Sequence, residues 1–270
     1  MTRGPGEFSP ALLEAVTELA QADRLLVALD FDGTLSPLVD RPYEARVLPE
    51  SARAIAELEI LPATWVAYIS GRSLDGLKRV IPADDLAFLV GSHGVEVQYG
   101  PHGGSLELKD DERATLAQLG AALQSVVDGF EGAHLETKPV GFGVHTRGLP
   151  AAEAKKVNDA AYRAVEKVPG RFTVRDGKGI LEFSVREATK GDAIQRMRAH
   201  VSATAVFFAG DDVTDEDGFV VLREGDVGVK VGEGPTAAEY RVGDPHEFAR
   251  LLTLLAVARS RRDARASRGA

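Results

Sequence analysis

Five-residue apolar runs alternate with amphipathic stretches over much of the chain. The clearest runs are Leu25–Leu29, Trp65–Ile69, Leu86–Val90 and Ala205–Ala209. Strands of a parallel sheet are buried on both faces, so unbroken apolar runs of this length predict parallel strands. Helical spacing follows the runs at Ser51–Leu58, Ser73–Val80, Lys190–His200 and Asp215–Leu222. This alternation predicts an α/β core with a mainly parallel sheet.

The middle of the chain has a different pattern. Two long helical patterns cover Asp111–Val127 and Ala151–Val165. Short alternating segments lie near His134–Thr137, Phe142–Arg147, Phe172–Arg175 and Ile180–Val185. Helices mixed with antiparallel-type strands predict an α+β insertion in the α/β core. We therefore expect residues 1–105 and 186–270 to form the core and residues 106–185 to form a second, inserted domain.

Composition and charge exclude several classes of function. The 270 residues contain no cysteine, which excludes disulfides, thiolate metal sites and cysteine nucleophiles. A formal charge of −9 and the lack of a basic stripe argue against nucleic-acid binding. No signal pattern and no apolar run near the length of a membrane span, about 20 residues, is found, so a cytoplasmic protein without a membrane segment is expected. The arginines from Arg259 to Arg268 are expected to form a solvated, frayed tail.

The first candidate for chemistry is an acidic pair, Asp30 and Asp32, directly after the run Leu25–Leu29. Residues two apart in an extended chain point the same way, and open α/β sheets bind ligands at the carboxyl ends of their strands. Gly33 permits a tight turn, and Thr34 adds a hydroxyl group. A carboxylate can attack phosphorus when a divalent cation screens the charges of both groups. An isolated acidic pair is more often a turn, but the longer run is more specific.

A second acidic cluster follows the run Ala205–Ala209, with five carboxylates among the seven residues 211–217. Thr214 and Asp215 are suited to capping the next helix. Capping leaves Asp211 and Asp212 unexplained, because they stand at a strand end as the first pair does. Oxygen ligands of this kind predict a hard cation, and magnesium fits best beside a phosphate.

Two further groups would complete a phosphate site. Ser70, Gly71 and Arg72 follow the run Trp65–Ile69, and their hydroxyl and backbone N–H groups could bind phosphate oxygens. Lys190 opens a predicted helix and could offset negative charge. Taken singly, Ser70 is expected to be a helix cap and Lys190 a surface lysine. They gain significance because they occur in one chain together with the two acidic clusters, so that four groups stand at strand ends or helix starts.

In this order, the four groups resemble the motifs of the haloacid dehalogenase superfamily of phosphatases. The matching residues are Asp30, Asp32 and Thr34, then Ser70, then Lys190, and last Asp211 and Asp212. The resemblance covers residues 24–245 and implies a Rossmann-like core with an inserted C2-type cap. It also implies that Asp30 is the nucleophile and Asp32 the acid and base. Magnesium would be held by Asp30, the backbone carbonyl of Asp32, and Asp211 with help from Asp212, while Asp215 orients a bound water. Ser70 and Lys190 would bind the transferring phosphoryl group.

More narrowly, the chain resembles the trehalose-6-phosphate phosphatase family. The core motifs that carry this resemblance run from Gly210 to Glu216, from Ile69 to Arg72 and from Gly91 to Glu96. The resemblance implies that substrate is bound by Thr34, Gly71, Arg72, His93, Glu136, Lys138, His145, Arg147, Lys178 and Glu182. The even separation of Lys178 and Glu182 would put them on one face of a strand. Thr189 departs from the asparagine often found before the lysine, and the segment after Glu182 lacks a frequent proline.

Three readings of function remain open at this point. The resemblance implies a phosphatase acting on trehalose 6-phosphate, with a possible functional link to the synthase that makes this substrate. The same chemistry could serve sucrose phosphate, mannosylglycerate phosphate or a monosaccharide phosphate. A catalytically silent sugar-phosphate sensor is the third reading, although a sensor needs no nucleophile.

Overall fold

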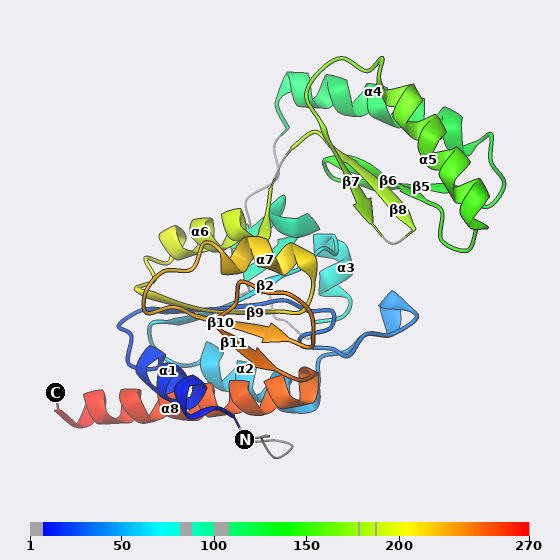
Figure 1. The fold of residues 1–270 in the computed structure, drawn as a ribbon. Coiled ribbons are helices and arrows are strands. Elements are labelled where there is room, and N and C mark those ends of the chain that lie inside the picture. The colour runs from blue at the N-terminus through cyan, green and yellow to red at the C-terminus, as the bar shows by residue number, and fades with distance from the viewer. Residues whose placement is uncertain (1–7, 82–87, 100–107, 178, 187, 270) are drawn as a thin grey trace. The chain divides into compact units, whose positions relative to one another are not determined.

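A computed structural model describes residues 8–81, 88–99, 108–177, 179–186 and 188–269. The chain divides into two compact units (Figure 1), one formed by Met1–Gly104 with Thr189–Ala270 and the other by Ser105–Ala188. Helices of the first unit are α1 (Pro10–Leu19), α2 (Pro49–Glu59), α3 (Leu74–Lys78), α6 (Lys190–His200), α7 (Val213–Phe219) and α8 (Pro245–Gly269), with short 3-10 turns η1 (Pro42–Glu44) and η2 (Ser92–Gly94). Its strands are β1 (Leu25–Leu29), β2 (Thr64–Ile69), β3 (Phe88–Gly91), β4 (Glu96–Tyr99), β9 (Ala205–Gly210), β10 (Val227–Val231) and β11 (Tyr240–Val242).

The seven strands of the first unit form one sheet in the order β11-β10-β9-β1-β2-β3-β4. All neighbouring strands are parallel except β3 and β4. The predicted α/β fold with a mainly parallel sheet is therefore confirmed. Leu29, at the end of the central strand β1, pairs with Tyr68 of β2 and Ala209 of β9. Because these three strands end in register, the residues that follow them meet at one edge of the sheet.

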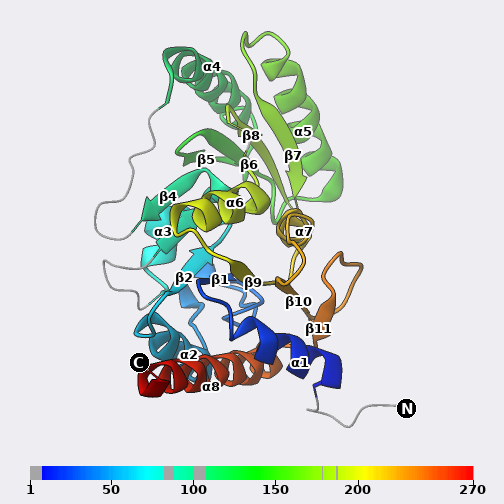
Figure 2. The ribbon, with the colours of Figure 1, turned by 90° about the vertical axis from the view of Figure 1, so that its left-hand side faces the viewer.

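Helices cover both faces of this sheet (Figure 2). On one face, α1, α2 and α8 bury apolar side chains, among them Leu12, Leu58 and Phe248. On the other face, α6 and α7 bury Ile194 and Phe219 against the sheet. Burial of both faces is the physical reason for the unbroken apolar runs in the strands, since neither face of the sheet is left to water.

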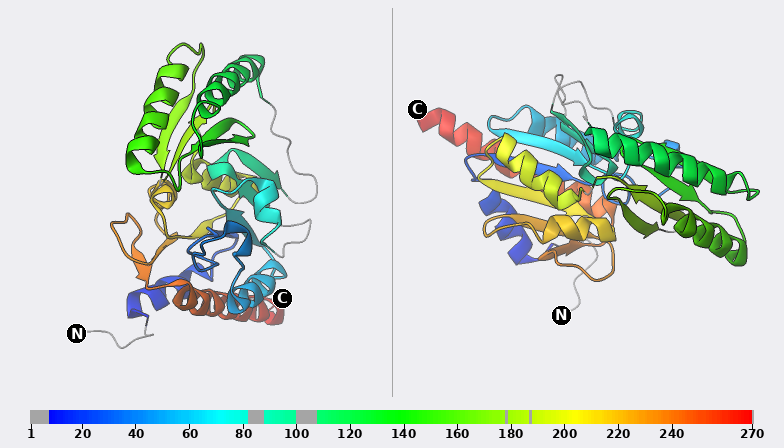
Figure 3. Two further views of the ribbon diagram at one scale, coloured as in Figure 1. Left: turned by 90° about the vertical axis from the view of Figure 1, so that its right-hand side faces the viewer. Right: turned by 90° about the horizontal axis from the view of Figure 1, so that it is seen from above.

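The second unit is an antiparallel sheet with two helices on one face (Figure 3). Its elements are α4 (Asp110–Val127), β5 (His134–Lys138), β6 (Gly141–His145), α5 (Ala151–Val165), β7 (Thr173–Gly177) and β8 (Ile180–Ser184). The strand order is β5-β6-β8-β7. Phe142 pairs with Phe183 and Val144 with Leu181, and all four are buried. The residues that alternate with them point to the opposite face, which is polar.

The C-terminal arginines differ from the prediction. They belong to helix α8, and Arg259 is buried at 1% exposure. Its guanidinium donates to Thr64 Oγ1, Ala63 O and Ala20 O, each at 3.0 Å. The prediction of a frayed, solvated tail is wrong at Arg259, because this side chain is buried and donates to backbone carbonyls at the ends of neighbouring segments.

Within the described residues, no helix has the length and apolar character needed to cross a bilayer.

Candidate functional site

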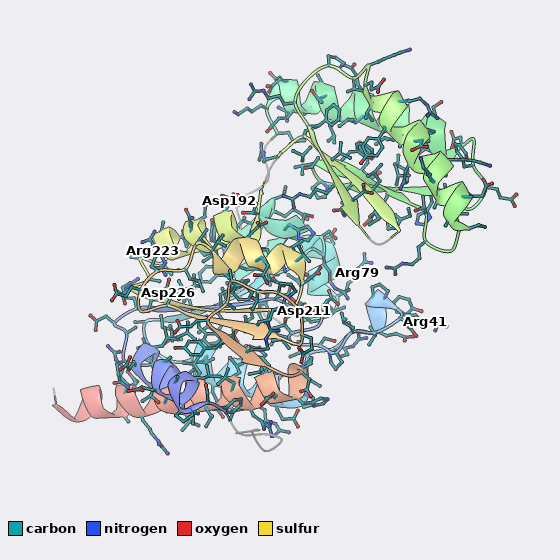
Figure 4. The ribbon with its side chains drawn as sticks, viewed as in Figure 1. Arg41, Arg79, Asp192, Asp211, Arg223 and Asp226 are labelled. Atoms are coloured by element: carbon teal, nitrogen blue, oxygen red, sulfur yellow. The ribbon has the colours of Figure 1, made fainter. Side chains whose placement is uncertain are left out.

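The candidate site lies at the carboxyl edge of the central sheet. Asp30 follows β1, Ser70 follows β2 and Asp211 follows β9. The Asp30 N–H donates to Ala209 O at 3.0 Å, which keeps the end of β1 beside β9. Figure 4 shows Asp211 at one end of β9, whereas Asp226 lies near the other end, where it accepts from the Val206 N–H at 2.8 Å. The strand ends therefore bring together groups that are far apart in the sequence.

A buried lysine joins two of the acidic groups. Lys190 Nζ lies 2.6 Å from Asp30 Oδ1 and 2.6 Å from Asp215 Oδ1. The three side chains are 3%, 6% and 0% exposed, respectively, so Lys190 is not the surface lysine expected from its sequence alone. The other oxygen of Asp215 accepts the N–H groups of Asp211 (3.0 Å) and Asp212 (2.8 Å). Asp215 thus ties Lys190 to the loop that carries Asp211.

The charges of this cluster do not balance. Burial raises the pKa of Asp30 well above its ordinary value; Lys190 opposes this rise, while Asp215 and Asp211 add to it. Burial and the nearby Asp215 raise the pKa of Asp211 to about 6. Burial disfavours the charge of Lys190, but Asp30 and Asp215 outweigh it and raise the Lys190 pKa. Excess negative charge in a dry site favours binding of a cation.

The donor atoms at this position fit a divalent cation. One carboxylate oxygen from each of Asp30, Asp211 and Asp215 lies within 4.8 Å of the others. Asp30 Oδ2 is buried and has no hydrogen-bond partner among the described residues. A hard cation with oxygen ligands would satisfy this oxygen and offset the excess charge. Asp32 and Asp212 do not contribute side-chain oxygens to this group of three.

Asp212 has a different local role from the one predicted. Helix α7 begins at Val213, two residues before the expected Asp215, and Asp212 is its N-cap. The Asp212 side chain accepts the Val213 N–H at 2.8 Å. The prediction that Thr214 and Asp215 cap the helix is therefore wrong for Thr214 but confirmed for Asp215, which accepts the Asp212 N–H at 2.8 Å as the third residue of a capping box. Asp212 satisfies a backbone donor at the helix start, while Asp215 uses one oxygen in the cap and the other to contact Lys190.

Asp32 is held by Arg72 at the open side of the site. Arg72 Nε and a terminal nitrogen each lie 2.6 Å from one oxygen of Asp32. This two-point contact fixes the carboxylate more tightly than a single ion pair does. The Arg72 guanidinium also lies 5.2 Å from the ring centre of Phe31. The hydroxyl of Thr34 is buried and lacks a hydrogen-bond partner in the described part of the chain.

Ser70 belongs to a tight turn and is not the helix cap. Its Oγ accepts the Arg72 N–H at 3.1 Å. The cap of α3 is Ser73, whose side chain accepts the Gly76 N–H. At Gly71, an added Cβ would lie 2.6 Å from the His93 ring, so the glycine lets this imidazole approach the turn. Gly33 is needed for a similar reason: its φ is +85°, and a Cβ there would lie 2.0 Å from Asp211 Oδ2.

The second unit carries four of the predicted substrate-binding residues on its open polar face. The pairs Glu136–Gly143 and Gly143–Glu182 lie side by side across the sheet, and Lys138 and His145 share this face by alternation. Lys138 forms an ion pair with Glu182, and His145 Nε2 lies 2.8 Å from Glu136 Oε2. The structure thus gathers polar groups with different donor and acceptor properties on one surface.

Two further predicted residues of this unit are Arg147 and Lys178. Arg147 is exposed in the turn that follows β6. Lys178 lies outside the described residues. Strand β8, which carries Glu182, begins at Ile180, and Gly179 before it lies in a turn, so the expected strand does not extend back through residue 179.

Two residues near the site were not among the predicted ones. Lys230 on β10 is 3% exposed, and its Nζ lies 3.4 Å from Asp212 O and 3.3 Å from Glu216 Oε1. A lysine inside a five-residue buried strand is a signal that could have identified it. Glu96 accepts the Ser92 hydroxyl at 2.7 Å and the Leu74 N–H at 3.2 Å. The position of Glu96 shortly after Ser92 and His93 in the sequence is the signal that could have identified it.

Comparisons with known proteins identify the family of this chain. The trehalose-phosphatase family matches residues 28–246. The chain is 30% identical to trehalose-6-phosphate phosphatase of Escherichia coli, over 79% of this chain and 79% of that protein. It is 31% identical to a bifunctional trehalose-6-phosphate synthase/phosphatase of Thermoproteus tenax, over 88% of this chain. The match spans only 33% of the Thermoproteus protein, about a third of its length.

Solved structures share the fold. A trehalose-6-phosphate phosphatase related protein superposes with a TM-score of 0.71 at 25% identity, over 88% of this chain and 99% of that one. A haloacid dehalogenase-like hydrolase from B. subtilis superposes with a TM-score of 0.58 at 16% identity, over 84% of this chain and 98% of that one. The second likeness supports the fold alone. By the match of residues 28–246, the chain belongs to the trehalose-phosphatase family.

Proposed function

We propose that this chain is a phosphoric monoester hydrolase that converts trehalose 6-phosphate to trehalose and phosphate. The observation that carries this proposal is the buried contact of Lys190 with Asp30 and Asp215, beside Asp211. A binding protein has no need for an aspartate with one buried, unpaired oxygen facing a cation site. Family membership supports trehalose 6-phosphate as the substrate.

In the proposed first step, the carboxylate of Asp30 attacks phosphorus in line with the sugar oxygen. An aspartyl-phosphate bond forms as the bond from phosphorus to the sugar oxygen breaks. Asp32, in its protonated form, gives its proton to the departing sugar oxygen. In the second step, ionised Asp32 takes a proton from water as this water attacks phosphorus. Phosphate then leaves, and both aspartates return to their starting forms.

Positioning of the phosphoryl group is assigned to Ser70 and Lys190. The ammonium of Lys190, already 2.6 Å from Asp30 Oδ1, would stabilise charge as it develops on the phosphoryl oxygens. Magnesium is the proposed cation, and it would be held by Asp30, Asp211 and Asp215, with the Asp32 backbone carbonyl and Asp212 as further candidates. When bound, this cation screens the charges of nucleophile and phosphate from each other. Asp215 accepts hydrogen bonds from Lys190 and from two backbone N–H groups, so we also assign it the task of fixing their arrangement.

The sugar hydroxyls are assigned to polar groups of the second unit. We propose that Glu136, Lys138 and Glu182, with His145, Arg147 and Lys178, bind sugar hydroxyls, because carboxylates accept and ammonium groups donate directional hydrogen bonds. On the first unit, we assign substrate contacts to Thr34, Gly71, Arg72 and His93. The Lys138–Glu182 ion pair keeps one donor and one acceptor side by side in the free protein.

Phosphate release from purified protein tests the function directly. Trehalose 6-phosphate would be compared with sucrose phosphate, mannosylglycerate phosphate and glucose 6-phosphate, each with magnesium and with a chelator. We expect release from trehalose 6-phosphate that the chelator stops and added magnesium restores. Release from another sugar phosphate alone would reject the substrate, and release that is indifferent to the chelator would reject the cation. If folded protein released no phosphate from any of these substrates, the result would favour the third reading, a catalytically silent sugar-phosphate sensor.

Glu182→Gln tests the assignment of the sugar site. The amide keeps the size of the side chain but loses the charge that pairs with Lys138. Binding of the sugar should therefore weaken equally in the ground state and in the transition state. We expect KM for trehalose 6-phosphate to rise on the order of tenfold with kcat changed less than about threefold. Glu153→Gln, on α5 of the same unit and paired with Lys156, is the matched control and should leave both constants unchanged. Unchanged KM in Glu182→Gln would remove this residue from the sugar site.

A functional link to a synthase follows from the proposed substrate. The Thermoproteus tenax relative is itself a bifunctional synthase/phosphatase. We propose that this chain consumes the product of such a synthase, because a disaccharide phosphate must be supplied by a reaction that joins two sugars.

A further inference from the structure

A left-handed turn separates β3 from β4 beside the candidate site. Ser92, His93 and Gly94 have φ angles of 49°, 56° and 110°. Non-glycine residues rarely adopt this conformation, and two in succession persist only where the surrounding contacts hold them. Strained backbone of this kind is concentrated at functional sites. The contacts of this turn therefore indicate what it does.

One side of the turn is bonded to the loop that carries Ser70. The Ser92 N–H donates to Arg72 O at 2.7 Å, and the His93 N–H donates to Ser70 O at 3.0 Å. The His93 ring covers Gly71, where even a Cβ would approach it to 2.6 Å. The turn thus holds the backbone of the Ser70–Arg72 loop at three successive residues.

The other side of the turn rests on the start of helix α6, which carries Lys190. A Cβ on Gly94 would lie 2.5 Å from Thr189 O, so the two backbones are in close contact. Arg196, one and a half turns along α6, donates to Gly94 O. The same three-residue turn therefore contacts the loop of Ser70 and the helix of Lys190, the two segments assigned to the phosphoryl group.

Glu96 fixes this turn from the first residue of β4. Its Oε2 accepts the Ser92 hydroxyl at 2.7 Å and the Leu74 N–H at 3.2 Å. Gly91 pairs with Glu96 across β3 and β4, and a Cβ on Gly91 would lie 2.7 Å from Leu74 N. One carboxylate oxygen thereby joins the turn to the start of α3, immediately after the Ser70–Arg72 loop.

We propose that Glu96 is a positioning residue for phosphoryl transfer. Through Ser92 and Leu74 it keeps the left-handed turn closed, and the turn keeps Ser70 and Lys190 at the spacing that a phosphoryl group requires. This role rests on the proposed function and adds a residue that contacts none of the reacting atoms. Displacement of a catalytic group by about 1 Å can lower a rate by about a hundredfold, so loss of this support should be measurable.

The test compares Glu96→Ala with Glu96→Gln. Alanine removes the acceptor for both donors, and we expect kcat/KM to fall about 10- to 100-fold. Inorganic phosphate, measured with magnesium by calorimetry, should bind the alanine variant about tenfold more weakly. In Glu96→Gln the amide oxygen can take the place of Oε2 and accept from both the Leu74 N–H and the Ser92 hydroxyl, so both constants should stay within about threefold of the original.

Gln98→Ala is the matched control, because Gln98 lies two residues further along the same face of β4. It should behave as the unchanged protein. A folded Glu96→Ala variant with normal phosphate affinity and normal kcat/KM, and only a lower Tm, would overturn the proposal. So would a glutamine variant as impaired as the alanine variant. Should Glu96→Ala not fold, Ser92→Ala removes one of the two contacts, and unchanged phosphate affinity there would overturn the proposal.

The two proposals fail in different ways. If the proposed function is wrong, the unchanged protein hydrolyses none of the sugar phosphates or only one other than trehalose 6-phosphate. If only the role of Glu96 is wrong, the unchanged protein is active and the alanine variant is equally active. Calorimetry with inorganic phosphate does not depend on turnover, so it tests Glu96 in both cases.

Discussion

Asp30→Asn should abolish phosphate release, with a loss of about 10⁴-fold or more, because it removes the oxygen that attacks phosphorus. The folded state should remain intact. In the folded protein without a cation, the pKa of Asp30 is raised, chiefly by burial. Because the pKa of Asp30 is higher in the folded than in the unfolded chain, ionisation of Asp30 lowers the stability of the fold, and a neutral amide of the same shape should not lower the free energy of unfolding. Lys190 Nζ can still donate to the amide oxygen.

The measurement combines kinetics with a covalent readout. Phosphate release from trehalose 6-phosphate would be followed with magnesium, and acid-quenched protein would be digested to locate a phosphoryl group. We expect the peptide with Asp30 to carry it in the original protein and to lack it in Asp30→Asn. Asp23→Asn is the control, because Asp23 is 87% exposed and pairs only with Arg262 among the contacts described. Activity in Asp30→Asn above about 1% of the original would end the mechanism.

The buried strands could be predicted because burial on both faces leaves a direct trace in the sequence. Leu25–Leu29 is an apolar run with no interruption, and it is β1 to the residue. Strand β4 leaves no such trace, since Glu96 and Gln98 alternate with apolar residues at the edge of the sheet after an unusual turn. Edge strands need only one covered face, so their sequences are less distinctive.

Helix α8 shows how a misleading residue type hides a helical pattern. Arg259 lies four residues after Leu255 and seven after Leu252, the spacing of one buried helical face. Because arginine is rarely buried, the segment reads as a solvated tail. The carbonyls that satisfy Arg259 come from residues 20 and 63, and no local sequence pattern indicates that they are near.

The strand-end placement of the candidate residues was predictable, but the contacts among them were not. The strand-end positions of Asp30 and Asp211 follow from the alternation of strands and helices, since parallel strands present their carboxyl ends at one edge. The burial of Lys190 does not follow, because its two partners are 160 and 25 residues away. The contact of Asp215 with Lys190 depends on the helix starting with Asp212 as its N-cap. Several neighbouring residues have a similar tendency to occupy that position, so the sequence does not select among them.

Lys190→Met should impair both catalysis and folding. Methionine fills similar space but leaves Asp30 and Asp215 buried without their shared cation. Breaking a buried ion pair by removing one partner costs about 3 kcal/mol or more, so we expect a loss of this size in the free energy of unfolding without metal. The rate of phosphate release should fall about 10³-fold, because a preorganised charge near the phosphoryl group is lost.

Magnesium distinguishes this explanation from simple loss of packing. In Lys190→Met the cluster of Asp30, Asp211 and Asp215 keeps three carboxylates and no ammonium, so a divalent cation should stabilise the variant more than it stabilises the original protein. Chemical denaturation with and without magnesium measures this difference. Lys155→Met, an exposed lysine of α5 paired with Asp159, is the control and should show the same magnesium effect as the original. Equal stabilisation of Lys190→Met and the original protein would mean that Lys190 and the cation do not share the charge of these carboxylates.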